Sequence, residues 1–144
     1  IGTLARTIFV GDSDTFSTPY AAGTDGYIYD HEFGVDDDAN GAMSVSLASG
    51  DIDIGDGEYM MQVKRAVPDF KTLTGSVSMT LNAKEYPGSS ETLSSEAQTI
   101  SSTTKYVNPR VRGRQISISL SSSAVGDNWR MGTIRLDLVK HGKK

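Results

Sequence analysis

Cysteine is absent from the 144 residues, and the chain has only two histidines and one tryptophan. Without cysteine, no disulfide framework, thiolate zinc site or cysteine nucleophile can form. No apolar run approaches the roughly 18 residues of a membrane span, and no signal peptide is expected. The net charge of −4 argues against bulk affinity for nucleic acid or for an anionic membrane. We therefore predict no cofactor and no membrane span.

The length favours one domain with a buried core. Apolar residues make up 37% of the chain, and Ser, Thr, Gly and Asp are abundant, as is typical of β proteins with many turns. We expect a single β-sandwich domain over residues 1–144. Because the chain begins at Ile1 rather than at methionine, a fragment and a processed product of a longer protein are both open interpretations.

Strand patterns recur along the chain, whereas no apolar helical repeat lasts longer than two turns. Residues 76–83 alternate most regularly between apolar and polar side chains. In two later runs, alternate positions are again apolar: Ile116, Ile118 and Leu120, then Ile134, Leu136 and Leu138. Alternation of period two indicates strands with one buried face. The pattern predicts an all-β fold, an antiparallel β-sandwich with seven to nine short strands.

Four other segments carry more specific predictions. Residues 26–33 are predicted to form a strand with these side chains on one face: Tyr27, Tyr29, His31 and Phe33. Residues 43–48 are predicted to form another, with Val45 and Leu47 inward. The turn 55–57, Gly-Asp-Gly between two extended runs, predicts a tight hairpin. The low-complexity segment 89–104 is interpreted as a loop or solvated strand.

Arg110, Arg112 and Arg114 occupy every second position before a predicted strand. An extended backbone would hold all three guanidinium groups on one side. Three interpretations stay open: charges that protect an exposed strand edge, an ion-pair strip that meets an adjacent subunit, or a surface that touches DNA. Three arginines would bind DNA only weakly. The turn Asp36–Asp38 is one partner for a subunit contact, and Gly113 is predicted to let another chain segment approach closely.

Acidic turns and a histidine are candidates for metal binding and catalysis. Asp36–Asp38 and the run 51–56 have carboxylate spacing that suits a hard cation. The second run departs from an EF-hand loop at Gly55 and Gln62, so solvated turns are the favoured interpretation. His31 lies between two carboxylates, but no nucleophile-elbow, zinc or phosphate-loop motif accompanies it. We predict that the chain is not an enzyme.

Trp129 lies in a turn that precedes a predicted strand. An exposed tryptophan would offer a stacking platform for a sugar. Its neighbours Arg130 and Gly132 favour packing at one end of the sandwich or in an interface. The rival interpretation, a carbohydrate- or receptor-binding module, needs several exposed aromatic residues on one face. The candidates are Tyr27, Tyr29, Phe33 and Trp129.

Short motifs follow one another in a characteristic order: Gly55-Asp56-Gly57-Glu58, Pro68-Asp69-Phe70, Gly75-Ser76-Val77, Tyr86-Pro87-Gly88, Arg112-Gly113-Arg114-Gln115 and Asp127-Asn128-Trp129-Arg130-Met131-Gly132, with Arg135 and Asp137. In this order they resemble the C-terminal β region of structural proteins from tailed bacteriophages, such as tail, tail-nozzle or DNA-stabilisation proteins near the head–tail junction. The resemblance covers Tyr29 to Lys140 and leaves out the first 25 or so residues.

The resemblance implies a location in the virion and a role in assembly. A protein of this kind would be a ring or tube subunit without chemistry of its own. Its partners would be copies of itself and other virion proteins, with weak, transient contact with viral DNA as a further expectation. The binding-module interpretation would instead place the chain in a tail fibre.

Overall fold

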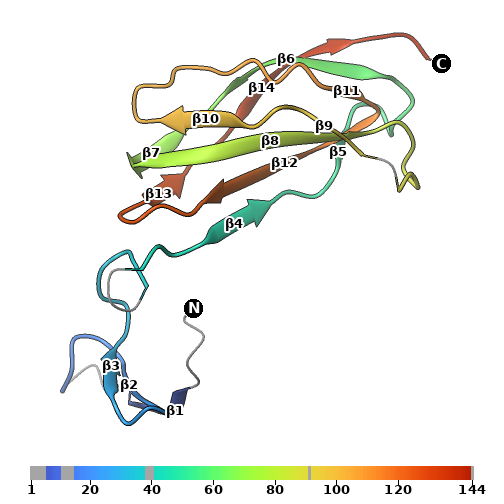
Figure 1. Ribbon diagram of the computed structural model, residues 1–144. Coiled ribbons are helices and arrows are strands. Elements are labelled where there is room, and N and C mark those ends of the chain that lie inside the picture. The colour runs from blue at the N-terminus through green and yellow to red at the C-terminus, as the bar shows by residue number, and fades with distance from the viewer. Residues whose placement is uncertain (1–5, 11–14, 38–40, 91, 144) are drawn as a thin grey trace.

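The computed structural model describes residues 6–10, 15–37, 41–90 and 92–143, and all their regular structure is β (Figure 1). In chain order the strands are β1 (Arg6–Val10), β2 (Tyr20–Gly23), β3 (Ile28–Asp30), β4 (Val45–Ala48), β5 (Ile52–Asp53), β6 (Met61–Val67), β7 (Phe70–Thr74), β8 (Ser76–Lys84), β9 (Leu93–Ser94), β10 (Gln98–Ser101), β11 (Arg112–Gly113), β12 (Gln115–Ser122), β13 (Asn128–Met131) and β14 (Arg135–Lys140). The predicted all-β class is confirmed.

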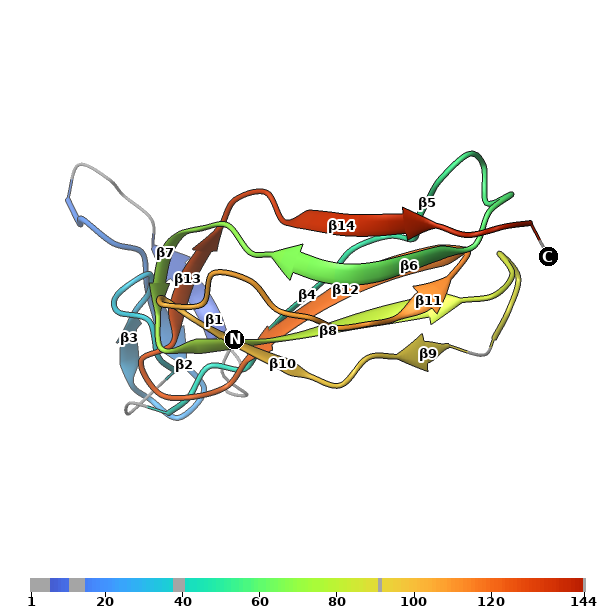
Figure 2. The same ribbon diagram turned by 90° about the horizontal axis from the view of Figure 1, so that it is seen from above.

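Strands β4 to β14 form an antiparallel sandwich, as the sequence predicts. One sheet has the order β10-β8-β12-β4, with β5 added to β12 and β9 added to β8, and the facing sheet has the order β11-β6-β14. Figure 2 shows the two layers stacked, with β6 and β14 over β8 and β12. Within the sandwich, eight strands have four residues or more: β4, β6, β7, β8, β10, β12, β13 and β14. With β1, β2 and the shorter strands, the described residues form fourteen strands, more than the seven to nine predicted.

The core lies between these layers and follows the alternation of β8 and β12. Every second residue of β8 is buried: Val77, Met79, Leu81 and Ala83. They pair across the ladder with the apolar positions of β12, for example Met79 with Leu120. Val63 and Ala66 close the core from β6. Burial of one large aliphatic or methionine side chain contributes roughly 1.5–3 kcal/mol, so this alternation holds the sheets together.

A two-stranded sheet of β7 and β13 closes one end of the sandwich. β7 continues the line of β6 beyond Pro68, and β13 precedes β14 in the same way, so that β7 pairs with β13. The amide of Gly132 donates to the carbonyl of Asp69 at 2.7 Å, between the two paired stretches. This two-stranded sheet places Trp129 over the end of the core.

Two local predictions need correction. The turn 55–57 does not join a hairpin, because β5 pairs with β12 while β6 pairs with β11 and β14. The turn instead carries the chain from one sheet to the other. The segment 89–104 contains β9 and β10, and its Ile100 is fully buried. It therefore supplies a core strand rather than only a solvated loop.

The N-terminal part forms a separate sheet of order β1-β2-β3. Figure 1 shows it away from the sandwich, joined to it by the chain between β3 and β4. The two core clusters, with the side chains packed against them, contain no described residue before Ile54. The single domain over 1–144 stays a prediction, with the sandwich core confined to residues 54–138.

Two strands near this junction differ from their predicted form. β3 spans only Ile28–Asp30 rather than residues 26–33, because Gly26 and Glu32 have φ angles of 86° and 62° and interrupt the extended backbone. β4 forms as predicted, but Val45 and Leu47 are 37% and 43% exposed rather than inward. β4 is the last strand of its sheet order, so one flank of its side chains is left uncovered.

Candidate functional site

The three arginines do not form one row. Arg110 has a φ of 50°, in the left-handed region, so the extended backbone that the prediction required is broken there. Arg112 lies in β11 and is exposed, whereas Arg114 lies at the bend between β11 and β12 and is half-buried. The prediction of three guanidinium groups on one side is therefore wrong.

Arg114 makes its contacts within the chain. Its Nη1 donates to the carbonyl oxygens of Gly57 at 3.0 Å and Glu58 at 2.7 Å. Its guanidinium also lies 6.0 Å from the ring centre of Tyr86. These contacts hold the turn between β5 and β6 against the bend that begins β12. Arg114 therefore stabilises the sandwich.

Gly113, beside it, is a point of close approach, as predicted. A Cβ placed there would lie 2.8 Å from both the Cβ of Ala83 and the carbonyl oxygen of Lys84. The next amide, that of Arg114, donates to the same carbonyl at 2.8 Å. Only a residue without a side chain lets the chain cross from the β6 sheet to the β8 sheet at this distance.

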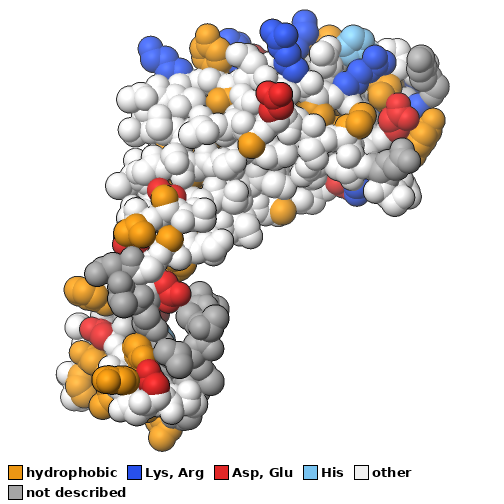
Figure 3. Space-filling view, viewed as in Figure 1, with side chains coloured by type: hydrophobic (Ala, Val, Ile, Leu, Met, Phe, Trp, Pro, Cys, Tyr) orange, Lys and Arg blue, Asp and Glu red, His pale blue; other side chains and the backbone are white. Residues whose placement is uncertain are grey.

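Arg112 belongs to a basic outer face on the β11-β6-β14 sheet. It pairs with Gln62, and because Gly113 and Met61 point inward, Arg112 and Gln62 point outward. Two positions along β6, Lys64 is exposed on the same face. Figure 3 shows Lys and Arg side chains gathered along this side of the sandwich. We call Arg112, Lys64 and the neighbouring Arg65 the basic face.

Much of the charge near this face is already paired. Arg65 contacts Asp137 at 2.5 Å and lies 5.5 Å from the ring centre of Tyr106. Within the described part of the chain, Arg110 and Arg112 form no ion pair. These two arginines and Lys64 are among the described cations that form no ion pair within the chain.

The acidic turns are also engaged locally. Asp36 accepts a hydrogen bond from the amide of Gly126 at 2.6 Å, and Asp37 pairs with Gly41. Asp38, the third residue of the predicted partner turn, lies outside the described residues. Asp51 forms an ion pair with Lys84 at 2.8 Å. The carboxylates of Asp36 and Asp51, and the backbone of Asp37, therefore organise loops of the chain itself.

In the part of the chain that the structure describes, the histidines and carboxylates form no shared centre. His31 follows β3, and its amide donates to the carbonyl of Pro19 at 2.7 Å. His141 lies on the sandwich, 3.3 Å from the side-chain oxygen of Gln62. Among residues 6–10, 15–37, 41–90 and 92–143, no three His, Asp or Glu side chains are grouped to hold a metal ion. In the same residues, no helix has the length and apolar content to cross a membrane.

Trp129 packs at the end of the sandwich. Its ring meets Phe70 edge to face at 6.1 Å, and its Nε1 donates to the hydroxyl of buried Ser122 at 2.9 Å. Tyr27 and Phe33, by contrast, are 68% and 79% exposed in the N-terminal part. Trp129 is thus packed and hydrogen-bonded within the sandwich, whereas a stacking platform for a sugar needs an open ring.

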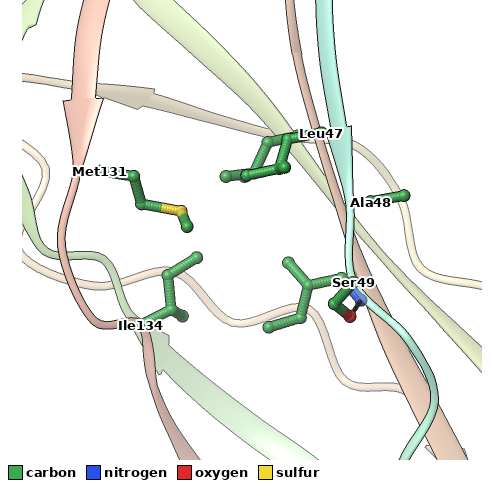
Figure 4. Close-up of a pocket in the computed structure, with 7 residues that line it drawn as sticks. Leu47, Ala48, Ser49, Met131 and Ile134 are labelled. Carbon is green, nitrogen blue, oxygen red and sulfur yellow. Dashed lines mark hydrogen bonds between the residues drawn. The ribbon is translucent and has the colours of Figure 1, made fainter.

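An apolar groove opens where both sheets end, at β4 and at the start of β14. It is lined by Leu47, Ile118, Leu120, Met131 and Ile134, with Ala48 and Ser49 beside them. Its volume is about 310 Å³. Figure 4 shows Leu47, Met131 and Ile134 directed into the opening. We call these five residues the apolar groove.

The sequence pattern does not reveal this groove, because alternation shows which residues face inward but not where a sheet ends. No family model matches the chain, and a search of curated proteins finds no match either. One sequence signal does bear on the candidate surfaces. Residues 7–38 carry eight acidic residues and no Lys or Arg, whereas residues 39–144 carry ten acidic residues and 13 Lys or Arg.

Proposed function

We propose that the chain is a structural subunit of a tailed-phage virion, located in the tail or at the head–tail junction. It assembles by contacts with copies of itself and with other virion proteins, and it carries out no chemistry. The ordered motifs from Gly55 to Asp137 support the virion assignment. The all-β sandwich is compatible with such a role, although the same architecture serves many other functions.

The division of charge along the chain carries the assembly part of the proposal. The acidic stretch 7–38 ends before the sandwich begins, and the surplus of Lys and Arg lies within the sandwich. Opposite charges on two separate parts of one molecule attract neighbouring copies and orient them, because complementary potentials fix register and specificity. Arg112 and Lys64 on the basic face are the residues that we assign to this contact.

We assign only weak, transient contact with viral DNA to the same cations. Arg114 is hydrogen-bonded within the chain, so Arg110 and Arg112 are the two of the three predicted arginines that we assign to this contact. The affinity of a protein for DNA rises with the number of phosphates that it neutralises. Two arginines on a chain of net charge −4 neutralise too few for stable binding. A conduit for DNA benefits from such weak binding.

The mass of the protein in solution, measured by light scattering at low and high salt, tests the proposal. We expect a discrete oligomer with a mass that is a multiple of 15.4 kDa at low salt. High salt should lower that mass, since the Debye length falls from about 10 Å at 0.1 M to about 3 Å at 1 M. Arg112→Glu should lower it at low salt as well. A monomer under all these conditions would contradict self-assembly.

A further inference from the structure

The tip of the β2–β3 hairpin, residues 24–28, presents two large apolar side chains to solvent. Tyr27 is 68% exposed and Ile28 is 76% exposed. A hairpin that leaves such residues uncovered at its outermost point gains nothing from them in an isolated chain, because apolar surface is stabilised by removal from water. The tip therefore has the chemistry of a surface that inserts into an apolar site.

The tip is also held in a defined shape. The amide of Gly23 donates to the carbonyl of Tyr27 at 2.8 Å, which closes the turn. The carboxylate of Asp25 accepts from the amide of Tyr27 at 3.3 Å and from the hydroxyl of Tyr29 at 2.5 Å. Such a pre-organised tip loses little conformational entropy when it binds.

The apolar groove has the complementary character. Its five lining side chains are apolar, and its volume of about 310 Å³ is within the range of protein binding pockets. Arg130, next to Met131, and Arg135, next to Ile134, are both exposed. Asp69 lies 3.7 Å from Arg135 and is its partner. The charges of the two parts are complementary as well, since residues 7–38 carry eight acidic residues and no Lys or Arg, whereas the surplus of Lys and Arg lies in the sandwich.

Within one chain, the β2–β3 tip lies away from the apolar groove. Asp36, on the connection between the N-terminal sheet and β4, accepts the 2.6 Å hydrogen bond from Gly126 in the β12–β13 loop. This contact holds the segment that follows β3 against the end of the sandwich. Figure 1 shows β2 and β3 extending from there away from the body of the sandwich that contains β12 and β14. The tip that can enter this groove is then that of another copy.

We propose that the β2–β3 tip of one copy docks into the apolar groove of a second copy, with Tyr27 and Ile28 against Leu47, Met131 and Ile134. The proposal rests on the self-assembly described above and names the surfaces that meet. Because tip and groove are different surfaces, the contact is heterologous. Copies joined in this way form a closed ring or an open filament, according to the rotation between neighbours.

Disulfide trapping tests the contact directly, since the chain contains no cysteine. Full-length Ile28→Cys and Met131→Cys proteins are mixed, oxidised mildly and run on a non-reducing gel, and the mixed band is identified by mass. The control replaces Met131→Cys by Leu93→Cys, an apolar position on β9 that is more accessible than Met131, 62% against 37% exposed, and lies at the other end of the sandwich sheet. We expect mixed dimers with Met131→Cys and not with Leu93→Cys. Equal trapping of the two would overturn the proposal.

A double variant, Ile28→Cys with Met131→Cys in one chain, separates docking between copies from folding back within a copy. Docking between copies gives linked dimers and larger species. An intramolecular disulfide that forms independently of protein concentration would overturn the proposal in favour of the chain's own tip.

A mixing experiment tests the direction of the contact. Ile28→Asp places a charge on the tip and leaves the groove unchanged, whereas Met131→Asp places a charge in the groove and leaves the tip unchanged. At high salt, where the charge contact of the basic face is screened, each protein alone should be a monomer of 15.4 kDa. Mixed together, they should form a pair of about twice the chain mass and nothing larger, since one functional tip and one functional groove remain. Leu47→Asp, at a position 43% exposed, serves as a second groove variant if Met131→Asp does not fold.

The outcomes distinguish this contact from self-assembly as such. Unchanged oligomers in both Asp variants would overturn the tip-and-groove contact and leave the assembly role in place. A wild-type protein that stays monomeric would overturn both.

Discussion

Arg112 and Arg114 are two residues apart in the sequence, yet the fold uses them differently. The backbone bends between β11 and β12, so Arg112 stays on the outer face of one sheet while Arg114 reaches the carbonyls of Gly57 and Glu58. The residue between them, Gly113, makes this bend possible by its contact with Ala83 and Lys84. Three consecutive residues therefore have three different roles: Arg112 is exposed on the outer face, Gly113 allows the crossing between sheets, and Arg114 anchors the turn.

Gly113→Ala is expected to destabilise the fold. The added methyl group would lie 2.8 Å from two atoms of β8, one of them a backbone carbonyl oxygen that cannot move aside easily. Overpacking of this kind costs about 1–3 kcal/mol of the free energy of unfolding. Gly88→Ala is the matched control, since a Cβ there meets nothing within 4 Å. Urea denaturation of both variants measures the difference, and equal midpoints would contradict the close contact.

At the scale of elements, the sequence predicts the faces of strands better than their partners. The alternation in β8 and β12 identifies the core residues Val77, Met79 and Leu120 correctly. The Gly55–Gly57 turn was predicted to be a hairpin because a turn between extended runs is common to hairpins and to crossings between sheets. The pairing of β5 with β12, which lies far along the chain, is what identifies this turn as a crossing between sheets rather than a hairpin.

The prediction that Arg110, Arg112 and Arg114 lie on one side was wrong for a related reason. Alternating positions share a side only while the backbone remains extended, and Arg110 adopts a left-handed conformation that its residue type does not signal. The apolar groove could not be located either, because it depends on where both sheets end. The charge division between residues 7–38 and the rest is visible in the sequence alone, and it is the feature that bears most directly on assembly.

Arg114→Met is expected to loosen the crossing between β5 and β6. The side chain keeps most of its apolar stem but loses two hydrogen bonds from a charged donor, at a cost of about 1–3 kcal/mol. Hydrogen exchange of the amides of residues 57–61 should become faster, and the urea midpoint should fall. Arg112→Met is the control, because Arg112 has no such bond within the described residues. Equal losses in both variants would show that Arg114 does not anchor the turn.

At the scale of the whole molecule, the chain consists of a sandwich with a closed core and an N-terminal sheet whose described side chains belong to neither core cluster. The two parts differ in charge as well as in position, since the acidic stretch 7–38 contains no Lys or Arg. A part that contributes nothing to its own core and exposes Tyr27, Ile28 and Phe33 is stabilised when those side chains are covered by another molecule. Its orientation then matters more than its own stability.

Asp36→Ala is expected to release that orientation while leaving the sandwich intact. The variant loses the hydrogen bond from the amide of Gly126, so the amides of β2 and β3 should show lower order parameters in ¹⁵N relaxation, relative to those of β8 and β12. Asp36→Asn keeps an acceptor oxygen for the same amide and should leave the order parameters unchanged. Because a mobile tip must be ordered before it can dock, Asp36→Ala should also weaken self-association. Order parameters in Asp36→Ala that match the wild type would show that other contacts orient the N-terminal sheet.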